Sequence, residues 1–136
     1  MQDIQQKNDL LFIQIALLAK TRSYQDNPTG GVLIKDNTLM TVAWNGTLPG
    51  AKNICPSSEP QFSEVIHTTQ NLIARAAKQG LVTEGSSVYL TEPPCLPCAL
   101  LLAQAGVSKV VIPSKATSLA LSKLQTAGVE VVCYEL

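Results

Sequence analysis

Two cysteines in this sequence are spaced so that they could hold a metal ion or carry redox chemistry. Cys95 and Cys98 are three residues apart in Pro94-Cys95-Leu96-Pro97-Cys98, where a predicted strand ends and a predicted helix begins. We expect the N-terminus of that helix to lower the pKa of the thiols and to favour thiolate, the form that binds metals. Taken alone, the pair fits half of a zinc site and a redox-active dithiol about equally well.

His67 favours the zinc interpretation. It is the only histidine in the chain, and it lies near the start of the predicted helix that precedes the cysteine pair. Most lone histidines are ordinary surface or core residues, but here the residue would complete a set of three ligands. One His and two Cys leave the fourth tetrahedral position of zinc to water, which is the layout of a catalytic zinc site. We therefore predict that His67, Cys95 and Cys98 bind Zn²⁺.

The elements that must position these ligands follow from the apolar patterns. Helical spacing predicts helices over about residues 3–22, 63–80, 98–105 and 116–126. Short apolar runs predict strands over residues 32–34, 39–44, 87–90, 109–112 and 129–134. Loops are expected over residues 22–31 and 46–60, and an Asp-Asn turn at residues 36–37 should join the first two strands into a hairpin.

The order of these elements predicts the fold class. Helices and strands alternate in the second half, which indicates parallel strands joined by right-handed crossovers. The leading hairpin makes the sheet mixed. We predict one α/β domain over residues 1–136, with three α/β/α layers around a mixed five-stranded sheet.

Composition limits the partners. Ten basic and ten acidic residues give a formal net charge of zero. The sequence has no block or stripe of basic residues of the kind that binds duplex nucleic acid. The sequence has no run of 18 apolar residues that could span a membrane. Residues 1–9 lack the charged stretch followed by an apolar stretch that marks a signal peptide. We expect a cytoplasmic protein that binds a small molecule, with no membrane and no duplex nucleic acid as partner.

Several motifs in order along the chain resemble those of the cytidine/deoxycytidylate deaminase superfamily, and its deoxycytidylate branch most of all. The segment His67-Thr68-Thr69-Gln70-Asn71-Leu72-Ile73 is similar to the family's H-A-E-x-N-A-I block. The segment Thr91–Ala99 is similar to its T-x-x-P-C-x-x-C-A strand end. Residues 27–34 resemble its P-V-G-A-V-I-V strand, and Ala43-Trp44-Asn45-Gly46 resembles its G-Y-N-G turn. Two later Ala-Gly-Val turns, at 105–107 and 127–129, also match.

The resemblance implies a cytidine deaminase-like fold, zinc as cofactor, and hydrolytic deamination of a free pyrimidine deoxynucleotide, of the dCMP to dUMP type. It implies a homo-oligomer. In that family zinc activates water for attack on C4 of the cytosine ring, and a glutamate two residues after the histidine moves the protons. The substrate-binding positions that it implies here are Asn45, Thr29, Gly30 and Thr68, to which we add Glu92 at the rim of the pocket.

The family's glutamate position is occupied by Thr69. A threonine hydroxyl cannot carry a proton near pH 7 as a carboxylate does, and general acid–base catalysis contributes typically about 10²–10⁴-fold. We therefore expect little or no ordinary deamination. Three explanations stay open: an engineered inactive variant, a natural silent homologue that binds a nucleotide or a partner, or a substitute carboxylate. The candidates for that carboxylate are Glu64, if the helix begins early enough, and Glu92.

Two other functions share part of this sequence pattern. They are those of a CxxC redox protein and a tRNA adenosine deaminase, although the neutral charge and the Trp44-Asn45-Gly46 turn favour the nucleotide branch. Cys133 is predicted to be a small core residue and Cys55 a free loop thiol. A second, structural zinc site is not expected, because the chain has no second histidine.

Overall fold

A computed structural model of the chain describes residues 4–50, 64–113 and 118–134. Its elements run in the order α1 (Ile4–Lys20), β1 (Gly30–Lys35), β2 (Thr38–Trp44), α2 (Thr68–Gln79), β3 (Ser87–Leu90), α3 (Leu96–Gln104), β4 (Lys109–Pro113), α4 (Leu119–Thr126) and β5 (Glu130–Tyr134). The predicted order of helices and strands is confirmed. Within the described residues, no helix is long and apolar enough to cross a lipid bilayer.

The five strands form one mixed sheet in the order β2-β1-β3-β4-β5. β1 pairs antiparallel with both β2 and β3, whereas β3, β4 and β5 are parallel. The β1–β2 hairpin turns at Asp36 and Asn37, whose φ angles of 52° and 59° suit the two-residue turns that match strand twist. The predicted mixed five-stranded sheet and its Asp-Asn turn are therefore both present.

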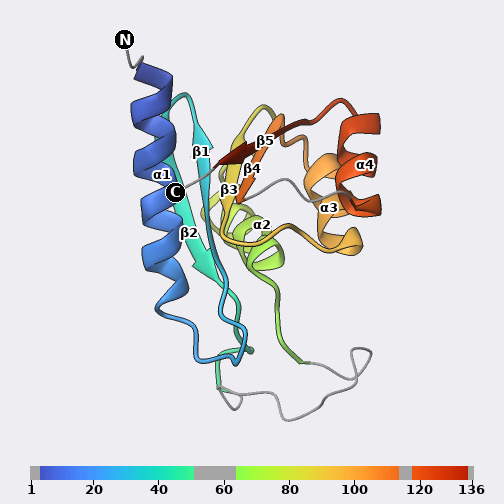
Figure 1. The fold of residues 1–136 in the computed structure, drawn as a ribbon. Helices are drawn as coiled ribbons and strands as arrows, with labels where there is room; N and C mark the ends of the chain where they lie inside the picture. The colour runs from blue at the N-terminus through green and yellow to red at the C-terminus, as the bar shows by residue number, and fades with distance from the viewer. Residues whose placement is uncertain (1–3, 51–63, 114–117, 135–136) are drawn as a thin grey trace.

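The helices cover the two faces of the sheet unequally (Figure 1). α1 packs alone on one face, where Phe12, Ile13 and Ala16 meet Val32, Tyr89 and Val111. α2, α3 and α4 share a core on the other face, with Leu72, Leu102 and Leu124 fully buried. The two crossovers of the parallel half step in one direction along the sheet, from β3 to β4 to β5, and α3 and α4 pack together on the same side, as crossovers of one hand require. The layers are one helix, the sheet, and three helices.

A glycine pair lets two helices approach the start of β1. A Cβ on Gly30 would lie 2.5 Å from the carbonyl oxygen of Ala16 and the amide nitrogen of Lys20 in α1. A Cβ on Gly31 would lie 2.9 Å from the Thr68 side chain at the start of α2. The loop predicted over residues 22–31 therefore ends earlier than expected, because Gly30 and Gly31 are the first residues of β1.

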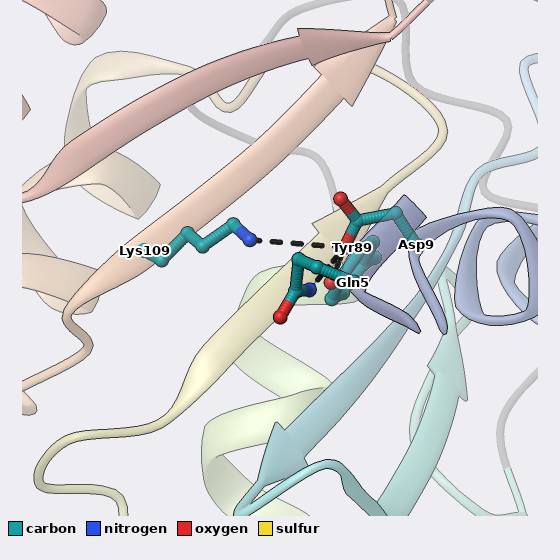
Figure 2. Close-up of polar contacts among 4 residues, drawn as sticks. All are labelled: Gln5, Asp9, Tyr89 and Lys109. Carbon is teal, nitrogen blue, oxygen red and sulfur yellow. Dashed lines mark hydrogen bonds and ion pairs between the residues drawn. The ribbon is translucent and has the colours of Figure 1, made fainter. Parts of the chain in front are cut away.

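A small polar cluster fixes α1 to the sheet (Figure 2). The Tyr89 hydroxyl donates a hydrogen bond to the Asp9 carboxylate, which also accepts one from Gln5 at 2.8 Å and lies 3.7 Å from the Lys109 ammonium. Burial, and then the Asp9 hydrogen bond and charge, raise the pKa of Tyr89. Tyr89 thus stays neutral, and its hydroxyl remains a donor for α1.

Two predicted details are wrong. The helix expected from residue 63 begins at Thr68 with His67 as its N-cap, so Glu64 lies outside it and shares no helical face with His67. Cys133 is exposed rather than buried, because β5 is an edge strand of the sheet. Cys55 and most of the predicted 46–60 loop lie outside the described residues, as do the first residues of the predicted 116–126 helix.

Candidate zinc site

The predicted ligands lie at the N-termini of two neighbouring helices. His67 is the N-cap of α2, and Cys95 is the N-cap of α3, with Cys98 in the first turn. The Gln70 side chain accepts a hydrogen bond from the His67 backbone amide at 2.7 Å, which fixes the first turn of α2 in the manner of a capping box. Pro97 within the first turn of α3 suits a helix start, where no amide donor is needed. Local sequence therefore places all three ligands where the helices begin.

The three donor atoms converge on one point. Nδ1 of His67 lies 3.2 Å from Sγ of Cys98 and 3.4 Å from Sγ of Cys95, and all three atoms lie within 4.8 Å of one another. A tetrahedral zinc ion with ordinary bond lengths would separate nitrogen and sulfur ligands by about 3.5 Å. Both the donor types and their spacing fit zinc, and the set leaves one coordination position open.

The protonation of Cys98 differs from the prediction. Its side chain is buried, and burial raises the pKa of the Cys98 thiol, helped by the hydrogen bond and charge of Cys95. A hydrogen bond from the Thr69 hydroxyl opposes this rise in pKa. The expectation that the helix N-terminus would lower this pKa is wrong for the metal-free protein, because loss of solvation outweighs it.

We expect zinc affinity to rise steeply with pH as a result. The raised pKa keeps Cys98 protonated through neutral pH, so zinc must displace that proton to bind the thiolate. Each proton released tightens binding about tenfold per pH unit. Competition with a calibrated zinc chelator between pH 6 and pH 8 measures the slope, and an affinity that stays flat with pH would contradict the assignment of Cys98 as a thiolate ligand.

A pocket opens beside these ligands. Its volume is about 280 Å³, close to the lower end of the range for small-molecule sites. It brings together every residue predicted for the site. The lining residues are Thr29, Gly30, Asn45, Val65, His67, Thr68, Thr69, Leu90, Glu92, Pro93, Pro94, Cys95 and Cys98. The roles predicted for the individual residues other than the ligands stay predictions.

Hydroxyl groups line the inner wall of the pocket. Thr68 and Thr69 are both buried in the first turn of α2. The Thr68 and Thr29 hydroxyls lie 2.6 Å apart, so one donates to the other. The Thr69 hydroxyl bonds to the Cys98 sulfur. Thr69 therefore contacts a metal ligand directly but offers no carboxylate at the position where the family carries its glutamate.

Asn45 is buried, and most of its side chain holds the neighbouring loop. Its Oδ1 accepts hydrogen bonds from the Ser23 hydroxyl at 2.6 Å and the Thr29 amide at 2.9 Å. Its Nδ2 donates to the Asn27 carbonyl at 2.9 Å. Among the described residues one N–H of the amide has no protein partner, so Asn45 shapes the wall of the pocket at least as much as it could contact a substrate.

Replacing Asn45 with alanine is therefore expected to reduce the free energy of unfolding by about 2–3 kcal/mol, because buried donors and acceptors of the loop lose their partners. Urea denaturation measures the change. Asn45→Asp keeps the acceptor oxygen but sets a second, charged carboxylate oxygen against the Asn27 carbonyl, so it should also lose stability at pH 7. An Asn45→Ala protein as stable as the parent would show that water replaces these bonds without loss.

The two candidate substitute carboxylates differ in position. Glu64 precedes α2 and does not line the pocket. Glu92 is exposed and lines the pocket, where it is the one carboxylate among the described lining residues. The Glu92 charge contributes to the raised pKa of Tyr134, after burial, and Tyr134 packs with the α1 face of the sheet. Glu92 therefore lies at the outer rim, toward the face that α1 covers.

Two residues that hold the walls of the site were missed from the sequence. Thr91 is buried, and its hydroxyl accepts a hydrogen bond from the Gly30 amide at 2.9 Å while its own amide donates to the Gly30 carbonyl at 3.0 Å. Asn71 donates to the Trp44 carbonyl at 2.8 Å, which joins α2 to the end of β2. Both residues belong to the quoted motifs, and their positions in those blocks were the available signal.

Comparison with known proteins agrees with this geometry. The family model described as the cytidine and deoxycytidylate deaminase zinc-binding region matches residues 6–114. The chain belongs to this family. The resemblance predicted from the motifs is confirmed, and the His67, Cys95 and Cys98 side chains of this deaminase-family member are positioned to bind its zinc ion.

Individual relatives cover most of the chain. ComE operon protein 2 of Bacillus subtilis is 27% identical over 135 residues, which cover 95% of this chain and 71% of the relative. Deoxycytidylate deaminase of Mycobacterium phage D29 is 28% identical over 123 residues, which cover 79% of this chain and 94% of the relative.

Crystal structures of dCMP deaminase from the cyanophage S-TIM5, in apo form and in complex with dCMP and dUMP, match with a TM-score of 0.85 and 28% identity over 98% of this chain and 100% of that chain. The predicted cytidine deaminase-like fold is confirmed.

Proposed function

We propose that this chain binds a free pyrimidine deoxynucleotide of the dCMP type at a zinc centre, and that Thr69 leaves it with little or no hydrolytic deamination. The observation that carries the proposal is the convergence of His67, Cys95 and Cys98 on a pocket whose inner wall offers the Thr69 hydroxyl in place of a carboxylate. The relatives named deoxycytidylate deaminase and the complex of the phage enzyme with dCMP and dUMP support this class of ligand.

The chemistry assigns separate tasks to the chain's residues. His67, Cys95 and Cys98 would hold the zinc ion, which when bound would supply the Lewis acidity that activates water for attack on C4 of the ring. Deamination replaces the exocyclic amine by oxygen and releases ammonia, so protons must move from water to the ring nitrogen and to the leaving group. Thr69 can hold a hydrogen bond but cannot ionise near pH 7. Glu92 lies at the rim, on the side of Tyr134, where it suits contact with the ligand better than this proton transfer.

The test combines binding with turnover. Zinc-loaded protein is titrated calorimetrically with dCMP and deoxycytidine, and ammonia release is followed over a long incubation. Saturable binding that disappears after zinc removal, with ammonia release near the blank, is the expected result. Binding of neither ligand would refute the proposal. Rapid ammonia release would show that a group other than the residue at 69 moves the protons.

We further propose that the chain acts as one domain in the cytoplasm and as a homo-oligomer. Exposed apolar side chains support self-association: Ile4, Leu11 and Leu18 recur at seven-residue intervals along α1 and are 76%, 50% and 67% exposed, so they lie along one side of the helix. Sedimentation velocity at several concentrations tests this, and a single species with the monomer mass of 14.5 kDa would contradict it.

A further inference from the structure

A second hollow adjoins the zinc pocket. It is lined by Lys20, Asn27, Pro28, Thr29 and Glu92, and its volume is about 370 Å³. Thr29 and Glu92 line both spaces, so the two meet across these side chains. A ligand anchored at the zinc ligands can therefore extend past Thr29 into the second hollow, which we call the outer hollow.

The walls of the outer hollow are held in place. Three hydrogen bonds join the loop that carries Asn27 and Thr29 to the Asn45 side chain. The Thr29 hydroxyl is also hydrogen bonded to the Thr68 hydroxyl. On the other wall, Glu92 stands between Thr91, whose backbone and side chain are both bonded to Gly30, and Pro93, whose ring restricts the residue before it. Lys20 ends α1, the helix that rests on Gly30. The outer hollow is thus built from anchored segments.

The charges of this cleft lie at its outer end. A cytosine ring must bring C4 to the zinc ligands, so the sugar and its 5′ substituent lie toward the mouth. Apart from the three zinc ligands His67, Cys95 and Cys98, the ionisable side chains that line the two spaces among the described residues are Lys20 and Glu92. They have opposite charges, and both border the outer hollow. A charged 5′ substituent in the outer hollow would therefore lie near both the Glu92 carboxylate and the Lys20 ammonium group.

We propose that the outer hollow takes the 5′ end of the ligand and that Glu92 is a specificity-determining residue, which disfavours a dianionic phosphate relative to a neutral 5′-hydroxyl. Lys20 acts in the opposite direction. The inference rests on the proposed function, because it assumes that cytosine binds at the zinc centre. A carboxylate about 8 Å from a phosphate dianion, at the high effective dielectric of a cleft mouth, changes affinity by about tenfold.

The test compares a nucleotide with its nucleoside. Dissociation constants for dCMP and deoxycytidine are measured by calorimetry on the zinc-loaded parent, Glu92→Gln, Lys20→Gln and Glu130→Gln at pH 7.5, in low and high salt. Glu92→Gln should bind dCMP about tenfold more tightly and leave deoxycytidine unchanged, while Lys20→Gln should weaken dCMP alone. Glu130→Gln removes an exposed acid at the start of β5 and should change neither. High salt should shrink both effects, because it screens exposed charges.

The outcomes separate the two proposals. If both ligands bind every variant and the ratio of their affinities does not change in Glu92→Gln, Glu92 does not set specificity and only this inference fails. Equal changes for dCMP and deoxycytidine would also overturn it, since they would indicate a contact with the nucleoside rather than with the 5′ charge. If neither ligand binds the parent or Glu92→Gln, the proposed function fails, and this inference fails with it.

Discussion

Replacing Thr69 with glutamate is expected to raise the rate of ammonia release from dCMP by about 10²–10⁴-fold, the usual contribution of a positioned general acid–base group. Thr69 is buried in the first turn of α2, lines the pocket and already contacts the Cys98 sulfur. A carboxylate from this position would extend into the pocket beside the three zinc ligands, where the ring would lie. Steady-state ammonia release by zinc-loaded parent and variant, side by side, measures the gain.

Thr69→Gln is the matched control for that gain. Glutamine has the length of glutamate and can hydrogen bond, but it cannot exchange a proton near neutral pH. If Thr69→Glu is fast and Thr69→Gln stays at the rate of the parent, proton transfer alone was missing. Equal rates in all three proteins would mean that the residue at 69 does not limit turnover. Activity above the blank in none of them, with dCMP bound, would favour a silent nucleotide-binding homologue.

Removal of one zinc ligand should have the second large effect. Cys98→Ala is expected to weaken zinc binding by at least about 100-fold, because loss of a direct ligand exceeds the 10–100-fold typical of outer-shell partners. Metal content after dialysis against a weak chelator should fall from near one equivalent of zinc to near none. Ligand binding should be lost in parallel, since the pocket is built around the metal ligands.

Cys133→Ala serves as the control, since Cys133 is an exposed free thiol on β5 and lies outside the pocket. It should keep a full equivalent of zinc. The same proteins test the redox alternative: in the zinc-loaded parent, Cys95 and Cys98 should resist alkylation while Cys133 reacts. Rapid alkylation of Cys95 and Cys98 with zinc present, or full zinc content in Cys98→Ala, would contradict the assigned ligand set.

Much of the architecture could be predicted because the turns, strands and helices are marked by residues within a few positions of each of them. The Asp36-Asn37 turn, the alternating second half and the strand ending before Pro93-Pro94 each have signals within a few residues. The zinc ligands were predictable because the CxxC spacing, the single histidine and the motifs around them are local features of the sequence, even though both helix starts were misplaced by a few residues. The need for a third ligand, and the resemblance of the motifs, then brought His67 together with the cysteine pair.

The errors concern properties that depend on distant residues. The burial of Cys98 sets its pKa, and that burial comes from packing between elements, which no local pattern shows. Cys133 looked like a core residue in an apolar strand, yet its strand is at the edge of the sheet. Glu64 seemed to belong to α2, but the cap formed by His67 and Gln70 starts the helix later. Lys20 was not considered for the site, because it reaches the outer hollow only through the docking of α1.

The face of the sheet that α1 covers is packed by one helix alone and is therefore less stable against local unfolding than the opposite face. One face of the sheet has three helices that share a core, whereas the other relies on α1, with its apolar contacts and the cluster of Gln5, Asp9, Tyr89 and Lys109. Regions with fewer shared contacts open first in local unfolding. Since the backbone of α1 rests against Gly30 at the pocket, opening of this helix would remove one wall of the ligand cleft while the opposite core stayed folded. Ligand binding and the opening of α1 are thereby linked. A bound nucleotide should slow amide hydrogen exchange along α1, although Lys20 is the one side chain that this helix supplies to the cleft.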